Sequence, residues 1–276
     1  MTRTIGILHP GEMGSSVGAA ARANGNTVLW CSKDRSPETN RRAREDQLEA
    51  VNELSELLTR SDIVLSVCPT AFATEVARNV IDLGYRGVYV DANAVSPETT
   101  RRIGQALKGH EIDFVDGGIV GPPARSPGST ILYLSGAGSP KVEEIFRNSP
   151  LETRCVGGEP GQASAVKMAF AAWTKGSSAL LLATRALARA EGVSEALEHA
   201  WARFSPGLEE RANAAASATA PKAWRFIEEM HQIATTFATA GLPSEFHEGA
   251  AEVYERMRDF KGGEADLDAV LAALLE

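Results

Sequence analysis

The first half of the chain alternates short, β-branched apolar runs with longer stretches of helical periodicity. This alternation is typical of a parallel sheet with helices packed on its faces. The expected strands are Thr4 to Leu8, Thr27 to Trp30, Asp62 to Val67, Gly87 to Asp91, Ile112 to Asp116 and Thr130 to Leu134.

The second half has a different pattern. Past Glu159, Ala- and Leu-rich segments with helical periodicity run to the last residue, interrupted by glycines and prolines. The turn-rich Gly157-Gly158-Glu159-Pro160-Gly161 precedes a long helix expected from about Gln162 to Glu191, and the Ala- and Ser-rich residues 212–220 are expected to form a helix or a loop. We therefore expect an α/β domain over residues 1–158, built on a doubly wound parallel sheet, and an all-helical domain over residues 159–276.

Composition narrows the range of partners. The 276 residues, 43% of them hydrophobic, are enough for two domains. Lys and Arg total 28 against 36 Asp and Glu, and the resulting net charge of −8 disfavours a surface that binds nucleic acid or acidic lipid. We therefore expect small molecules as ligands.

The cysteines predict a reducing compartment. Cys31, Cys68 and Cys155 are odd in number and far apart, which favours small buried residues over disulfides, nucleophiles or metal ligands. The histidines also lack ligand spacing, so no metal site is expected. We find neither an export signal nor an apolar run as long as a membrane span, and we expect a soluble, cytoplasmic protein.

A glycine-containing turn follows the first expected strand. His9-Pro10-Gly11-Glu12-Met13-Gly14 lies between that strand and an expected helix through Arg22. In a Rossmann-type domain, backbone N–H groups at this helix start bind the pyrophosphate of a dinucleotide. Gly11 would let the pyrophosphate approach, Gly14 would let the helix pack closely on the strand, and His9 stands where the first glycine is expected. The alternative is a glycine-rich turn without a ligand.

The end of the second expected strand bears on the choice of cofactor. No carboxylate stands at the strand tip, where it would bind the ribose hydroxyl of NAD. Ser32, Lys33 and Arg35 could instead bind the 2′-phosphate of NADP, so NADP is favoured and NAD is possible. Alternatively, these residues form only a solvated face with Arg41 and Arg42.

With these motifs and its helical tail, the chain resembles the β-hydroxyacid dehydrogenase and 6-phosphogluconate dehydrogenase superfamily over its full length. The Gly-Leu-Gly-x-Met-Gly turn of that family corresponds to residues 9–14, and the loop after its third strand to Val67-Cys68-Pro69-Thr70. Its Asp-x-Ser-Thr-x-x-Pro segment resembles residues 91–97, with Asn93 in place of serine. The resemblance implies that Cys68, Pro69 and Asn93 lie at the cofactor and that Asn93 also contacts substrate.

The resemblance extends to two motifs of the substrate site. The Asp-Ala-Pro-Val-Ser-Gly-Gly motif resembles residues 116–122, where Val120 replaces a hydroxyl donor and Pro122 lacks an N–H. The Gly-x-Gly-x-x-x-Lys-x-x-x-Asn stretch resembles residues 161–171, which keep Lys167 and have Ala171 in place of the asparagine. By resemblance, Val120 and Gly121 would line the substrate site.

Lys167 is the expected catalytic residue. Hydride transfer needs a group that exchanges a proton with the oxygen or nitrogen on the reacting carbon, and an amine can do this in both directions. Without the resemblance, Lys167 would be interpreted as a surface lysine. Lys175, about 80° round the same helix, is the second candidate.

The helical tail supplies further candidates for substrate binding. Lys222-Ala223-Trp224-Arg225 and Glu228-Glu229-Met230-His231 resemble the tail of a branch whose substrates are uncharacterised. Lys222 and Trp224 could bind an anionic or aromatic group, or pack in a dimer interface. His231 could donate a proton or have a structural role.

The expected function is reversible NADP-linked hydride transfer to or from a small hydroxyacid-like or carbonyl molecule. An imine or amino-acid reductase and a non-catalytic NADP-binding sensor or assembly protein are the alternatives. The Ala-rich helical domain has little core of its own, which favours a homodimer.

Overall fold

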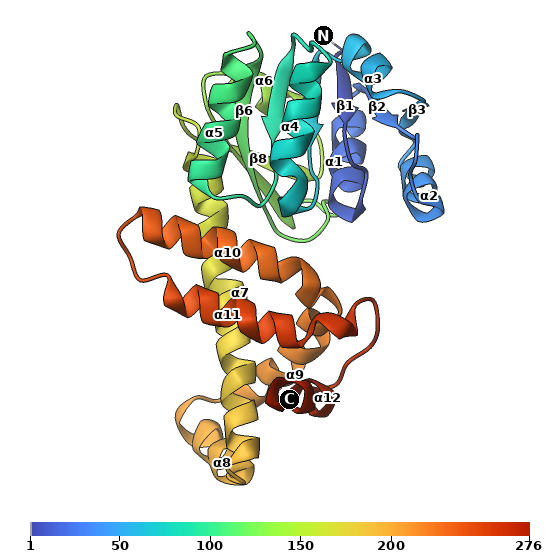
Figure 1. Ribbon diagram of the computed structural model, residues 1–276. Coiled ribbons are helices and arrows are strands. Elements are labelled where there is room, and N and C mark those ends of the chain that lie inside the picture. The colour runs from blue at the N-terminus through green and yellow to red at the C-terminus, as the bar shows by residue number, and fades with distance from the viewer. Residues whose placement is uncertain (1) are drawn as a thin grey trace. The chain divides into compact units, whose positions relative to one another are not determined.

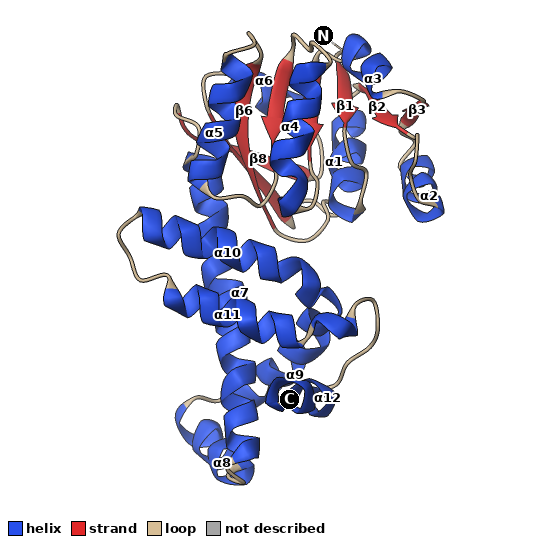
Figure 2. Ribbon diagram, viewed as in Figure 1, coloured by secondary structure: helices blue, strands red, loops and turns tan. Residues whose placement is uncertain are grey.

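The computed structural model describes residues 2–276, which form two compact units (Figures 1 and 2). The first unit ends at Met168 and holds every strand of the described chain, and the second, Ala169–Glu276, is helical. The fold class expected from the sequence, a doubly wound sheet followed by helices, is confirmed.

The sheet has eight strands in the order β3-β2-β1-β4-β5-β6-β7-β8. Neighbouring strands are parallel except β6 and β7, so one antiparallel pair interrupts the expected parallel sheet. The strand order reverses between β1 and β4, and open sheets of this kind bind ligands at such a switch point. The strands are β1 (Thr4–Ile7), β2 (Thr27–Cys31), β3 (Glu49–Val51), β4 (Ile63–Ser66), β5 (Val88–Asp91), β6 (Asp113–Val120), β7 (Thr130–Ser135) and β8 (Leu151–Gly157).

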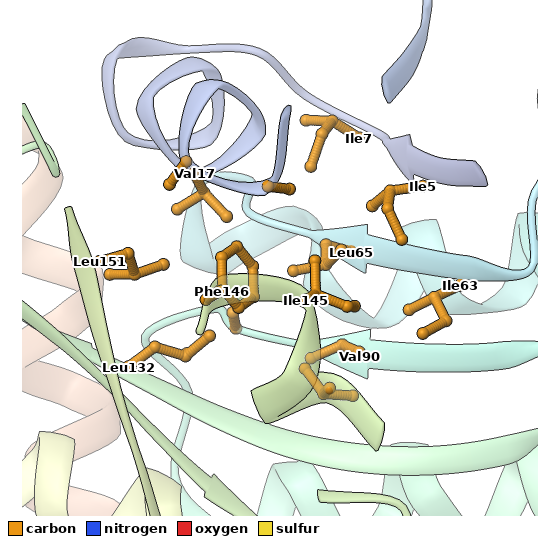
Figure 3. Close-up of a cluster of buried hydrophobic side chains, with 14 of the residues drawn as sticks. Ile5, Ile7, Val17, Ile63, Leu65, Val90, Leu132, Ile145, Phe146 and Leu151 are labelled. Carbon is orange, nitrogen blue, oxygen red and sulfur yellow. The ribbon is translucent and has the colours of Figure 1, made fainter. Parts of the chain in front are cut away.

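Helices cover both faces of the sheet. Along β4, Ile63 and Leu65 point into one apolar cluster and Val64 into another, as the two-residue period of a strand requires. The first cluster, drawn in Figure 3, includes Phe146 and side chains of α1, and the second includes side chains of α3, α4 and α5. The helices of this unit are α1 (Glu12–Ala23), α2 (Pro37–Glu45), α3 (Leu54–Arg60), α4 (Ala73–Asp82), α5 (Pro97–Lys108) and α6 (Ser139–Glu143), with 3-10 turns at Thr70–Phe72 and Glu144–Phe146.

The strands expected from the sequence did not include β3 and β8, and the expected end of β6 came too early. β3 has only three residues and β8 carries Glu152 and Arg154, so neither forms an apolar run. Both lie at the edges of the sheet, where a strand needs less apolar surface. β6 continues past its expected end at Asp116 through two glycines, which are poor strand formers on average but permit close approach of another backbone.

The helical unit follows the expected breaks. Gly192, Gly207 and Gly241 have left-handed φ values of 69°, 90° and 73° at helix boundaries, a conformation that favours glycine. Residues 212–219, left open between helix and loop, are helical. The elements are α7 (Gln162–Ala190), α8 (Ser194–Phe204), α9 (Leu208–Thr219), α10 (Ala223–Thr239), α11 (Glu245–Arg256) and α12 (Leu267–Leu275), with 3-10 turns at Ala220–Lys222 and Arg258–Phe260.

The core of this unit forms around α10 and α11, which run side by side (Figure 1). Met230, Ile233 and Tyr254 are completely buried there. The Tyr254 hydroxyl donates to the Lys175 carbonyl oxygen at 2.8 Å, which attaches α11 to α7.

The two units divide within α7 rather than at the turn-rich stretch where the sequence places the boundary. The reason is local packing. The beginning of α7 lies against Gly118 of β6, where an added Cβ would collide with the Ala163 carbonyl oxygen and lie 3.1 Å from Lys167 Cβ. The first turns of α7, including Lys167, therefore belong to the sheet unit.

Phe146 offers a test of the cluster in Figure 3, since it is 1% exposed. Phe146→Ala should lower the free energy of unfolding by about 3–5 kcal/mol, because it removes buried apolar surface and leaves a cavity. Urea denaturation would measure the change. Phe72→Ala is the matched control at a side chain that is 51% exposed, and an equal loss in both variants would contradict this assignment of the core.

Candidate functional site

The predicted cofactor-binding residues follow the carboxyl ends of four parallel strands. His9 to Met13 follow β1, Ser32 to Arg35 follow β2, Cys68 and Pro69 follow β4, and Asn93 follows β5. Parallel strands end at the same edge of a sheet, so the fold brings these segments to one edge, at the reversal of strand order.

The turn after β1 is built for close approach to the backbone. Gly11 directly precedes α1 as its N-cap residue, and no side chain caps that helix start. An added Cβ at Gly11 would meet nothing within 4 Å, whereas one at Gly14 would collide with the His9 carbonyl oxygen. The space beside Gly11 is thus open, whereas the space beside Gly14 is filled by the protein itself. An open, uncapped helix start fits the pyrophosphate of a dinucleotide, which accepts hydrogen bonds from backbone N–H groups.

His9 replaces a glycine without backbone strain. Among the described residues, the non-glycine positions with positive φ are Asp34, Gln47 and Glu111, so the turn does not require a glycine at position 9. Burial, together with the positive charge of Arg35, lowers the pKa of His9 to about 4. His9 is therefore a neutral side chain near pH 7 and adds no positive charge to the turn.

The residues proposed for the 2′-phosphate differ in their surroundings. Arg35 donates to the Leu8 carbonyl oxygen at 3.1 Å, so its guanidinium lies beside the turn that carries Gly11. Lys33 is an exposed partner of Glu53 at 2.7 Å, and the Ser32 hydroxyl donates to the Val51 carbonyl oxygen at 3.1 Å. Of these three residues, Arg35 is the one with a described contact beside the glycine turn.

Arg41 and Arg42 have another role. They pair with Glu45 and Glu38 at 2.8 Å each, one helical turn away on α2. Arg41 therefore fits the solvated helix face that the sequence left as an alternative, whereas the Arg42 side chain is only 18% exposed.

Asn93 joins the ends of β4 and β5. Its Oδ1 accepts from the Cys68 N–H at 2.6 Å and its Nδ2 donates to Ser66 Oγ at 3.0 Å. Its own N–H donates to Asp91 Oδ1 at 3.0 Å. With a side chain only 3% exposed, Asn93 shapes both loops where the sequence predicts the nicotinamide.

Asp91 is a buried carboxyl group that the sequence analysis did not select. Burial raises its pKa to about 7, and the nearby charge of Asp116 adds to this effect. Asp91 Oδ2 has no hydrogen-bond partner among the described residues, which is consistent with a carboxyl group that keeps its proton. The sequence could have pointed to Asp91, because a polar residue at the end of an apolar strand lies at the edge where parallel sheets bind ligands.

Lys167 lies on α7 beside β6, through the close approach at Gly118. Asp91 and Asp116 are paired in register on β5 and β6, and Asn93 and Gly118 each lie two residues further on. The chain therefore carries Asn93 and Lys167 to the same end of neighbouring strands. Val120 ends β6, and Gly121 follows with a φ of 120°, a conformation that favours glycine.

The remaining predicted substrate residues lie in the helical unit. Lys175 forms a buried ion pair with Glu229, and its ammonium lies 4.7 Å from the centre of the Phe226 ring. Trp224 is contacted by Lys261, whose ammonium lies 4.1 Å from the ring centre. Lys222 and His231 are exposed. Among the described contacts, these four residues do not form a single cluster, in contrast to those at the sheet edge.

The sequence predicts three buried cysteines, but only Cys31 is fully buried, since Cys68 is half-buried. Cys31 is buried, and burial raises the pKa of the Cys68 thiol to about 12, so neither is suited to be a nucleophile. Cys155 is exposed rather than buried, because β8 is an edge strand.

Over residues 2–276 we find no group of three or more His, Cys, Asp or Glu side chains placed to hold a metal ion. No helix in that range has the length and apolar character needed to span a membrane.

Comparison with known families settles the identity of the sheet unit. Residues 4–149, more than half of the chain, match the family described as the NAD binding domain of 6-phosphogluconate dehydrogenase. The chain belongs to this family. Residues 188–257 match a separate family described only as a domain of unknown function, DUF1932.

Two proteins of unestablished function are similar to most of the chain. An uncharacterised 28.5 kDa protein of Methanothermus fervidus is 29% identical over 193 residues, which cover 70% of this chain and 74% of that protein. A solved conserved protein of unknown function, described as structurally similar to 3-hydroxyacid dehydrogenases, is 28% identical with a TM-score of 0.68, covering 93% of this chain and 97% of that one.

Enzymes with the same fold are more distant in sequence. The 3-hydroxyisobutyrate dehydrogenase of Salmonella typhimurium superposes with a TM-score of 0.72 at 15% identity, covering 98% of this chain and 99% of that one. A reductive aminase of Aspergillus terreus, solved with NADPH and ethyl levulinate, superposes with a TM-score of 0.57 at 16% identity, covering 99% of both chains. The chain thus has the NAD(P)-binding fold of hydroxyacid dehydrogenases, which imine-reducing enzymes share.

Asp91 predicts a pH dependence of stability. The folded protein keeps a proton that an unfolded Asp loses above pH 3.8, so the free energy of unfolding should fall as the pH rises from about 4 to about 7. The slope from this one group is about 1.4 kcal/mol per pH unit. Asp91→Asn should remove this part of the slope, as urea denaturation at several pH values would show.

Asp113→Asn provides the control, because Asp113 is an exposed residue one strand away. It should keep the slope of the natural protein. Equal slopes for all three proteins would show that Asp91 loses its proton at an ordinary pH.

Proposed function

We propose that this chain is an NADP-dependent oxidoreductase that transfers hydride to or from a small hydroxyacid-like or carbonyl substrate, with Lys167 as general acid and base. The observation that carries the proposal is the placement of Lys167. The close contact at Gly118 holds this lysine at the sheet edge where the open turn at Gly11 and the loop at Asn93 also end.

In this proposal, different segments at that edge bind different parts of the cofactor. The N–H groups at the start of α1 would hold the pyrophosphate, and the loops at Cys68 and Asn93 would border the nicotinamide. When bound, the cofactor supplies or accepts the hydride. The amine of Lys167 accepts the hydroxyl proton during substrate oxidation, and its ammonium form returns a proton during reduction.

Arg35 supports the preference for NADP. Its guanidinium lies beside the glycine turn, and no acidic residue stands at positions 31–33 to repel a 2′-phosphate. An arginine can bind a phosphate through two N–H groups at once, which gives both charge and geometry.

Imine reduction is the second candidate. The asparagine expected four residues after Lys167 is Ala171, which is 1% exposed, and Val120 replaces the hydroxyl that would bind a carboxylate. Both changes make the site less polar than the hydroxyacid motif requires. A less polar site accepts a substrate without a carboxylate more readily.

Lys167→Ala tests the assignment. NADPH binding is measured by fluorescence, and hydroxyacids, aldehydes and imines are then screened for a change in nicotinamide absorbance. Loss of the proton carrier should lower kcat by about 100-fold or more. The affinity of Lys167→Ala for NADPH should change little. The natural protein should bind NADPH more tightly than NADH. The matched control is Lys108→Ala, at an exposed lysine of α5.

The sensor alternative predicts another pattern. Tight NADPH binding without turnover of any substrate class, unaltered by Lys167→Ala, would contradict an enzyme and favour a binding protein. Turnover that survives the loss of Lys167 would contradict its role as proton carrier.

We further propose that the chain forms a homodimer through α7. Trp173, Leu180 and Leu187 are 70%, 54% and 62% exposed, and they are spaced by seven residues along a helix of 29. This spacing puts them on one face, as in a helix that packs along a partner. Their neighbours Thr174, Gly176, Leu181 and Ala183 are uncharged, as at the centre of interfaces.

Leu180→Glu should separate the two subunits, because it puts a charge in the middle of this face. Sedimentation equilibrium should give twice the mass of the chain for natural protein and a single mass for the variant. Leu83→Glu, at an exposed leucine of the sheet unit, should leave the dimer intact. A single mass for the natural protein would refute the dimer.

A further inference from the structure

Four buried polar side chains form a row across the middle of the sheet. Ser66, Asp91, Asp116 and Ser135 are paired in register on β4, β5, β6 and β7. Each is at most 1% exposed. Burying polar groups costs free energy unless they form hydrogen bonds. The hydrogen-bond partners of these four residues therefore indicate their structural role.

Asp116 is the most fully bonded member of the row. Its Oδ2 accepts from the Ser135 hydroxyl at 2.8 Å, from the Gly161 N–H at 2.8 Å and from the Ser164 N–H at 3.1 Å. Its Oδ1 accepts from the Ser164 hydroxyl at 2.6 Å. Two of these donors are backbone N–H groups at the start of α7, so a strand residue caps a helix that begins 46 positions later.

Ser135 completes this cap. Its Oγ accepts from the Ala163 N–H at 3.1 Å, between the two backbone donors that Asp116 binds. The Ser164 hydroxyl also forms a hydrogen bond of 2.7 Å with Thr100 on α5. The first turn of α7 is therefore attached to two strands and one helix. A negative charge at a helix start is also favoured by the helix dipole, which offsets the cost of burying the carboxylate.

The cap determines where Lys167 lies. Lys167 follows Ala163 by four residues, about one helical turn, and both contact the position of Gly118. A helix start that shifts or frays would move the lysine with it. The other end of the same row, Ser66 and Asp91, binds the Asn93 side chain and backbone. One row of side chains thus holds both Asn93 and the helix that carries Lys167.

We propose that Asp116 is a positioning residue, which fixes the start of α7 on the sheet and thereby sets the place of the Lys167 amine relative to the Asn93 loop. The proposal rests on the proposed function for its effect on turnover. Its structural part, the fixing of α7, stands independently of any substrate.

Asp116→Asn is the test, since it keeps the shape of the side chain and removes the charge and one acceptor atom. Displacement of the lysine should lower kcat by about 100-fold. The KM for substrate and the affinity for NADPH should change little, because neither depends on the proton carrier. Hydrogen exchange should become faster at the amides of Gly161, Ala163 and Ser164 and stay unchanged in the last turns of α7.

Two more variants separate positioning from general damage. Asp113→Asn makes the same chemical change at an exposed site of β6 and should match natural protein in every measurement. Ser164→Ala removes one hydroxyl donor to Asp116 and leaves the charge in place, so it should show a smaller loss of kcat in the same direction. If Asp116→Asn does not fold, the same measurements on Ser164→Ala still test the positioning role.

The results distinguish the two levels of the proposal. Faster exchange at the start of α7 in a protein without turnover would overturn the proposed function and support the role of Asp116 in fixing the helix. A folded Asp116→Asn protein with natural exchange and natural kcat would overturn the positioning role. A parallel loss of NADPH affinity, KM and kcat would also overturn it, because it would indicate a general structural effect.

Discussion

A buried carboxylate in the sheet meets the backbone N–H groups that begin the longest helix, and the geometry of the candidate site depends on this contact. Helix starts present several N–H groups that lack partners within the helix. Here Asp116 and Ser135 satisfy those of α7 from strands β6 and β7. The helix that carries the candidate proton carrier is therefore held by β6 and β7, and β6 pairs with β5, the strand that leads into Asn93.

Charge explains why two carboxyl groups can lie side by side in this core. Asp116 is surrounded by hydrogen-bond donors and a helix start, which stabilise a negative charge. Asp91, its neighbour in register, accepts from the Asn93 N–H at 3.0 Å, and burial raises its pKa to about 7. Burial and the nearby charge of Asp116 both raise the pKa of Asp91, which favours the protonated form of Asp91 below about pH 7.

Small residues make the close contacts possible. An added Cβ at Gly14 would collide with the carbonyl oxygen of His9, and one at Gly118 with that of Ala163. The first contact packs α1 on β1 and the second packs α7 on β6. Each brings a candidate segment, the turn at Gly11 or the helix with Lys167, against the end of a strand. The absence of a Cβ at Gly14 and Gly118 therefore allows both close contacts.

The sequence by itself determined the alternation of strands and helices, the turn at Gly11 and Gly14 and the long helix with Lys167, because these depend on local periodicity and local turn geometry. It did not reveal the edge strands β3 and β8, whose polar residues give no apolar signal. Nor did it reveal the cap of α7 or the raised pKa of Asp91. Those depend on which side chains meet across neighbouring strands and how deeply they are buried, and only the tertiary structure decides that.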